Sequence, residues 1–144
     1  MVTATHSSRS GLDSALLLVS RLLLAYFFLP AGIGKITGFE GTVGYIASQG
    51  LPVPQLLAAA AIIAEVGGGL ALIVGFQTRL VAWGLAFFTL VAGCLFHNYW
   101  TLSGAQAATQ QLMFNKNLAI VGGLLALSVA GAGAWSMDSR RTGY

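Results

Sequence analysis

Four long apolar segments constrain this chain more than any other feature. They lie at residues 14–34, 56–76, 80–100 and 117–137. At a rise of about 1.5 Å per residue, a helix of about 21 residues crosses a hydrocarbon core of roughly 30 Å. Only 8% of the residues are charged, against roughly 25% in soluble domains. The sequence therefore predicts an all-α membrane protein, an antiparallel bundle of four transmembrane helices forming one domain at residues 14–137.

Short polar segments flank this domain, an N-terminal tail at residues 1–13 and a basic C-terminal tail at residues 138–144. The first apolar segment is too long for a cleavable signal peptide, and it carries Arg21. Basic residues are more numerous on the side of the bundle that holds the termini, and the positive-inside bias predicts both termini in the cytoplasm. The residues behind this prediction are Arg9, Arg79, Arg140 and Arg141 on one side, and Lys35 and Lys116 on the other.

Two charged residues fall inside the apolar segments. Glu65 lies near the middle of the second segment and Arg21 lies in the first. An unpaired charge at that depth is costly, and antiparallel helices place the two side chains about one turn apart. We therefore expect Arg21 and Glu65 to pair. Such a pair fits either a structural staple between helices or the lining of a polar cavity for a ligand or a proton.

A second polar group gathers where the predicted helices end. Lys35 closes the first helix, His97 lies near the end of the third, and Lys116 and Asn117 open the fourth, where a helix N-terminus favours an anion. These residues predict an electropositive pocket at the outer side of the bundle, with Arg21 and Glu65 as its floor, suited to a quinone or a small anion. His97, whose ordinary pKa suits proton exchange near neutral pH, and Glu65 are the candidate catalytic residues. For His97, an ordinary polar residue at a helix end is an equally open interpretation.

Other chemistry finds little support in the residues. Cys94 is the only cysteine, and Cys94 and His97 alone do not make a metal site. The other histidine is His6 in the N-terminal tail, which argues against a bis-histidine haem site within the bundle. No flavin, haem, iron–sulfur or phosphate-loop motif is present. The few basic residues do not indicate nucleic-acid binding.

Four stretches resemble the DoxX-like small membrane proteins: RLLLAYFFLPAGIGKITGF, AEVGGGLALIVGFQTRLVAWGLA, FHNYW and FNKNLAIVGGLLAL. The resemblance covers roughly residues 15–128, and it implies a four-helix protein of the bacterial inner membrane. Some members of the family are linked to quinone-coupled oxidation and others to redox-stress complexes. The residues on characteristic family positions are Arg21, Gly32, Lys35, Glu65, Gly69, Gly75, Arg79, His97, Lys116 and Asn117.

The resemblance and the polar residues leave three hypotheses. The first is an integral membrane subunit of a quinone-linked oxidoreductase or redox-stress system, with quinone as the bound cofactor and a soluble or membrane redox partner. The second is a non-catalytic anchor or assembly partner for a soluble redox enzyme. The third is a small transporter or proton pathway, against which stands the lack of an inverted repeat. Each is compatible with a lipid-embedded chain and with a homo-oligomer.

Overall fold

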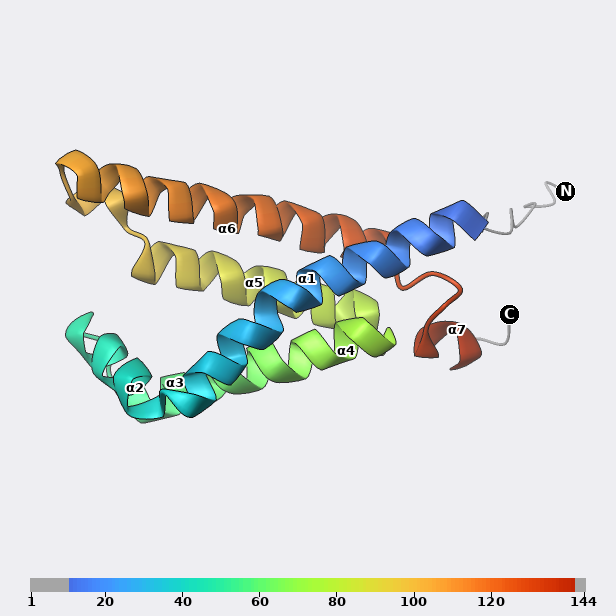
Figure 1. Ribbon diagram of the computed structural model, residues 1–144, viewed down its shortest axis with the longest axis horizontal. Helices are drawn as coiled ribbons and strands as arrows, with labels where there is room; N and C mark the ends of the chain where they lie inside the picture. Colours follow the sequence, from blue (N-terminus) through green and yellow to red (C-terminus); the bar gives the residue numbers. More distant parts are fainter. Residues whose placement is uncertain (1–10, 142–144) are drawn as a thin grey trace, which may run out of the picture.

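The computed structural model describes residues 11–141 and consists of helices throughout (Figure 1). The first span is α1 (Gly11–Thr37). The second is assembled from α3 (Pro54–Ile62), the π-helical turn η1 (Ile63–Gly67) and α4 (Gly68–Val74). The third is α5 (Thr78–Phe96), followed by the 3-10 turn η2 (Tyr99–Thr101), and the fourth is α6 (Gly104–Ala130). Two short helices, α2 (Phe39–Ser48) and α7 (Met137–Arg141), lie outside the spans.

Four helices in the described part are long and apolar enough to cross a membrane, and that part contains no strand. The prediction of an all-α bundle with four transmembrane helices is therefore confirmed. Residues 1–10 and 142–144 lie outside the described residues, and with them His6, Arg9 and most of the predicted N-terminal tail. The last residues of that tail, from Gly11 on, belong to α1.

The spans form two packed pairs. In one, α1 lies along α3, η1 and α4; in the other, α5 lies antiparallel to α6. Gly11 and Arg141 are at the same end of the molecule, here called the terminal end, and the opposite end, which carries α2 and η2, is called the loop end (Figure 1). The two pairs diverge towards the loop end, where α6 and α2 are far apart (Figure 1).

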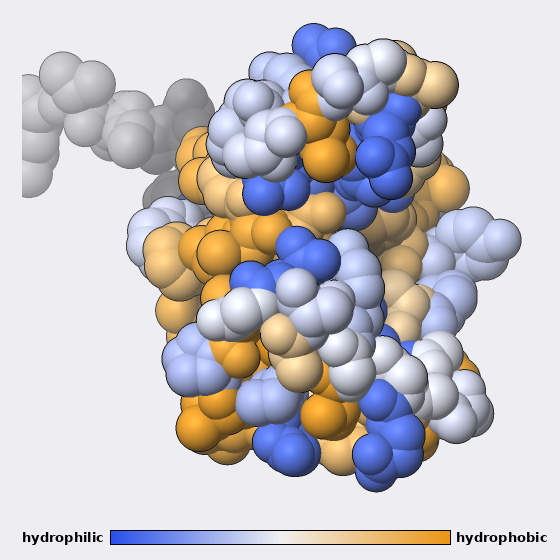
Figure 2. Space-filling model, turned by 90° about the vertical axis from the view of Figure 1, so that its left-hand side faces the viewer, coloured by the Kyte–Doolittle hydropathy of each residue, from blue (hydrophilic) through white to orange (hydrophobic). Residues whose placement is uncertain are grey.

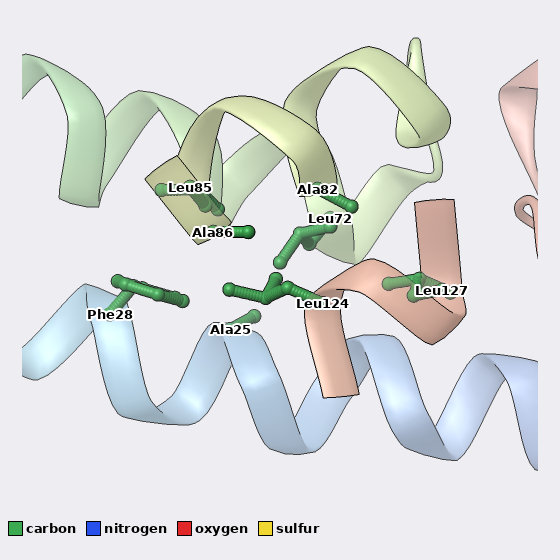
Figure 3. Packing of buried hydrophobic residues seen from close by; sticks show 8 residues of the cluster. All are labelled: Ala25, Phe28, Leu72, Ala82, Leu85, Ala86, Leu124 and Leu127. Atoms are coloured by element: carbon green, nitrogen blue, oxygen red, sulfur yellow. The ribbon is translucent and has the colours of Figure 1, made fainter. Parts of the chain in front are cut away.

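A small apolar core holds the pairs together between these ends. It combines side chains of all four spans, and three of its members are alanines, which let neighbouring backbones approach closely. The core residues are Ala25, Phe28, Leu72, Ala82, Leu85, Ala86, Leu124 and Leu127 (Figure 3). Because the exposed faces of the spans are also apolar, close packing distinguishes this core better than hydrophobicity does.

The fourth helix differs from the prediction. The sequence placed it at residues 117–137 with a long connection before it, whereas α6 begins at Gly104 and ends at Ala130. Residues 104–116 are polar but rich in alanine and glutamine, which favour helix, so the helix extends beyond its apolar part. At the other end the chain leaves the helix at Gly131, whose φ of 82° ends it.

The terminal end is closed by Arg21. Its guanidinium is fully buried and donates to the carbonyl oxygens of Leu72 (3.2 Å) and Ile73 (3.3 Å) in the last turn of α4, and to that of Trp135 (2.6 Å) after α6. A cation is favourable at a helix C-terminus, where carbonyl groups lack helical partners. Gly75 follows with a φ of 68°, and a Cβ there would overlap Arg21. We call this arrangement of Arg21 with the three carbonyls the clasp.

Asp138 completes the closure of the terminal end. Its carboxylate accepts hydrogen bonds from the backbone N–H groups of Gln77 (2.7 Å) and Thr78 (2.8 Å) at the start of α5, and its own N–H donates to Gly75 O (2.9 Å). Burial alone raises the pKa of Asp138, but the hydrogen bonds from Thr78 and Gln77, with the charge of Arg141, outweigh it and lower the pKa below its ordinary value. A residue sixty positions away thus caps α5.

Candidate functional site

A cavity of about 370 Å³ opens between the two helix pairs at the loop end. Its volume falls within the range of roughly 300–1,000 Å³ that is typical of small-molecule sites. Most of its wall is apolar and aromatic. The polar residues at its surface are Lys35, Thr42, Glu65, Thr89, His97, Lys116 and Asn117. Figure 2 looks onto this end of the molecule, where clusters of hydrophilic residues alternate with hydrophobic ones.

The charged centre of the cavity is an ion pair between α1 and η1. Lys35 Nζ donates to both carboxylate oxygens of Glu65, at 2.9 and 2.8 Å, and the Glu65 side chain is only 9% exposed. Gly32 allows α1 to approach η1 closely enough for this ion pair, because a Cβ at Gly32 would lie 2.6 Å from a methyl group of Val66. The π-helical turn η1 contains Glu65 at its centre, and such turns are frequent at functional sites.

The expected pairing of Arg21 with Glu65 is wrong. Arg21 bonds to the carbonyls of Leu72 and Ile73, which lie seven and eight residues beyond Glu65. At about 1.5 Å per residue this separates the two charges by about 10–12 Å along the span. The prediction took the start of the first helix to lie level with the end of the second, whereas the close approach at Gly32 places Lys35 beside Glu65. Arg21 is therefore not at the floor of the cavity, and it does not line it.

Two buried polar residues in the cavity wall were only partly foreseen. Thr89 on α5 is 3% exposed, and its hydroxyl has no hydrogen-bond partner among the described residues. Asn117 on α6 is 8% exposed, and its amide lies against Gly93, where a Cβ would come within 3.3 Å of Nδ2. Thr89 was missed because a threonine in an apolar helix commonly bonds its own backbone. The signal that could have found it is its spacing, since Thr89 and Gly93 share one face of α5 and His97 follows four residues after Gly93.

His97 follows α5 directly and lines the mouth of the cavity. Its Nδ1 lies 2.7 Å from Gln110 Oε1 of α6, so the neighbouring helix orients the ring. With Oε1 as the acceptor, Nδ1 carries the proton, and in the neutral ring Nε2 is then an acceptor. Gln110 was not predicted as a site residue, because the fourth helix was expected to begin only at residue 117.

Lys116 lines the cavity from the middle of α6. Its ammonium lies 5.4 Å from the centroid of the Phe27 ring and 3.5 Å from Met113 Sδ. The expectation that Lys116 and Asn117 sit at a helix N-terminus is wrong, because α6 begins at Gly104. No helix N-terminus therefore adds to the positive charge at this point.

Aromatic rings form much of the remaining wall, and α2 closes it from the side. Tyr45 of α2 stacks on Phe96 of α5 at a centroid distance of 5.5 Å, and Ile46 is buried beneath α2. Together these elements give the cavity an apolar and aromatic wall that also carries polar groups. The aromatic residues of the wall are Phe27, Phe28, Tyr45, Phe88 and Phe96.

Four apolar spans around a cavity that holds an ion pair define an integral membrane protein with a lipid-embedded candidate site. Within that class, the chain belongs to the DoxX family, whose family model matches residues 16–98. It is 43% identical over 127 residues to the inner membrane protein YqjF of Escherichia coli K12, covering 88% of this chain and 92% of the relative. It is 38% identical over 125 residues to the inner membrane protein YphA of the same organism, covering 87% and 89%. No solved structure matches the chain.

Proposed function

We propose that this protein binds a quinone in the cavity at the loop end, as a membrane subunit of a quinone-linked oxidoreductase or redox-stress system. The observation that carries the proposal is the Thr89 hydroxyl, buried in an aromatic wall and without a partner among the described residues. A buried hydroxyl without a partner is costly, and a ligand oxygen that accepts its hydrogen bond removes the cost. The membrane relatives support placing the protein in the bacterial inner membrane.

The chemistry of the wall suits a flat ring with carbonyl oxygens. Rings such as Phe28 and Phe96 offer faces for offset stacking or edge contacts. Thr89 and Asn117 each carry a donor that can reach a carbonyl oxygen, since both side chains lie at the cavity surface. A lipid-soluble quinone combines these two features and is present in the phase that surrounds the spans.

Proton exchange is the role we assign to His97 and Glu65. Reduction of a quinone consumes two protons along with two electrons. His97 lines the cavity, and its imidazole can accept a proton at one ring nitrogen and donate one from the other. Glu65 and Lys35 can shift a proton between their bonded atoms deeper in the cavity. We assign the electrons to a redox partner, because the residues of this chain suit quinone binding rather than electron storage.

The test is an isothermal titration of the detergent-purified protein with a short-chain ubiquinone. Thr89→Val keeps the shape of the side chain and removes the hydroxyl, and we expect it to weaken binding about tenfold, the equivalent of one hydrogen bond of about 1.4 kcal/mol. The unfolding midpoint should stay the same or rise, because the variant removes an unpaired buried group.

Thr109→Val is the matched control, because the Thr109 hydroxyl is exposed on α6 and donates to Ala105 O. Its affinity should equal that of the wild type. Equal affinity in the wild type and Thr89→Val, or no binding by the wild type, would contradict the proposal.

A further inference from the structure

The charges around the cavity do not balance. The chain contains four acidic residues, and all four are described. Asp13 and Asp138 belong to the terminal end, and Glu40 of α2 is not part of the cavity wall. Glu65 does line the cavity, but both of its oxygens are bonded to Lys35. The cavity therefore carries one positive charge more than its own residues neutralise.

That charge belongs to Lys116. The contacts of its ammonium, with the Phe27 ring and Met113 Sδ, are weak and bring no negative charge. Lys116 is an exposed residue of the cavity wall, so an anion in the cavity can approach its ammonium directly. Next to it along α6, the buried amide of Asn117 adds a donor at the cavity surface.

We infer that the ring bound in this cavity carries an acidic group that is ionised at neutral pH and pairs with Lys116. This inference rests on the proposed function and specifies the class of its ligand: a ring with carbonyl oxygens and an ionised hydroxyl or carboxylate. The ring lies among the aromatic side chains, the unpaired hydroxyl of Thr89 donates to a carbonyl oxygen, and the ionised group faces Lys116. Lys35 takes no part in binding this group, because Glu65 already neutralises it.

Two naphthoquinones of nearly equal size test the inference. 2-Methyl-1,4-naphthoquinone is neutral, and 2-hydroxy-1,4-naphthoquinone is ionised at neutral pH. Titrated into the full-length protein in a neutral detergent, the ionised ring should bind at least tenfold more tightly. Lys116→Met should abolish this preference, so that the two rings bind about equally, whereas Lys116→Arg should retain the preference.

Arg140→Met is the control variant, since it removes a positive charge at the terminal end, outside the cavity. It should keep the preference of the wild type. Unfolding midpoints of all variants show whether they are folded; if Lys116→Met is not, Lys116→Gln replaces it.

Four results would overturn the inference. If both rings bind equally to the wild type, or if Lys116→Met keeps the preference, the acidic group has no role and quinone binding itself stands. If phosphatidylglycerol added to the micelles displaces the neutral ring only while Lys116 is present, Lys116 binds a lipid headgroup. If neither ring binds, the proposed function falls together with the inference.

Discussion

The partner of Glu65 can be identified by a double-mutant cycle. The single variants are Lys35→Met and Glu65→Gln, and the double variant combines them. The matched comparison cycle joins Glu65→Gln to Arg21→Met, because the sequence predicted Arg21 as the partner of this carboxylate. Among residues 11–141, only Lys35 is bonded to Glu65.

The geometry sets the size of the effect. Removing one partner of a buried ion pair costs about 3–5 kcal/mol, because the other charge stays buried. The Lys35 side chain is 30% exposed, so water screens part of this penalty and we expect about 2–3 kcal/mol for either single variant. The double variant leaves no unpaired charge, so the coupling free energy between Lys35 and Glu65 should be about 2 kcal/mol.

Arg21→Met should also destabilise the protein, because three carbonyl groups, one of them in a buried hydrogen bond, lose their donor. Its effect should add to that of Glu65→Gln within about 0.5 kcal/mol, since the two residues share no partner and lie about 10–12 Å apart along the span.

The assay is reversible unfolding in mixed micelles of a mild detergent and sodium dodecyl sulfate, followed by tryptophan fluorescence. The free energy of unfolding of each variant gives the two coupling energies. A coupling below about 0.5 kcal/mol for Lys35 and Glu65, or one above about 1 kcal/mol for Arg21 and Glu65, would refute the register of the helices described above.

Three further predictions concern the terminal end. Gly75→Ala should lower the free energy of unfolding by about 2–4 kcal/mol, because alanine is strained at this positive φ and displaces Arg21. Gly84→Ala is the control in the same unfolding assay, because a Cβ at Gly84 would meet only open space. The pKa of Asp138 is lower in the folded protein than the ordinary carboxyl pKa, so the ionised carboxylate stabilises the fold above the ordinary pKa, and this stabilisation is lost as the pH falls through the folded value. The thermal-unfolding midpoint of the wild type should therefore fall in acid, and that of Asp138→Asn should fall less. Reporter proteins fused after Tyr144 should be active in the cytoplasm, and activity confined to the periplasm would reverse the orientation.

Much of the fold could be predicted from the sequence, because a helix that spans a membrane must be apolar over its whole length in the hydrocarbon core. The apolar segments predicted four helices, and the first three begin and end within a few residues of the observed bounds. The predicted bounds of the fourth helix were wrong, because hydropathy marks only the part of a helix that meets lipid, whereas α6 extends back through Gln111 and Gln110 to Gly104. Helix propensity, rather than hydropathy, was the signal for that extension.

The candidate site was predictable as a set of residues but not as a set of contacts. Lys35, Glu65, His97, Lys116 and Asn117 were expected near one another, and the structure places all five around one cavity. Which of them bond depends on how far one helix slides along another, and the close approach at Gly32 sets this offset. Nothing in the periodicity of either helix reports that offset.

The clasp places a pivot between the two helix pairs at the terminal end, opposite the cavity. Arg21 ties α1 and α4 to the segment after α6 at the terminal end, while the cavity lies where the two pairs diverge. The lever arm along α1 from Arg21 to Lys35 is fourteen residues, or about 21 Å. A rotation of about 5° about the clasp would therefore move the cavity walls apart by about 2 Å, enough to change the fit of a flat ring with little disturbance at the pivot.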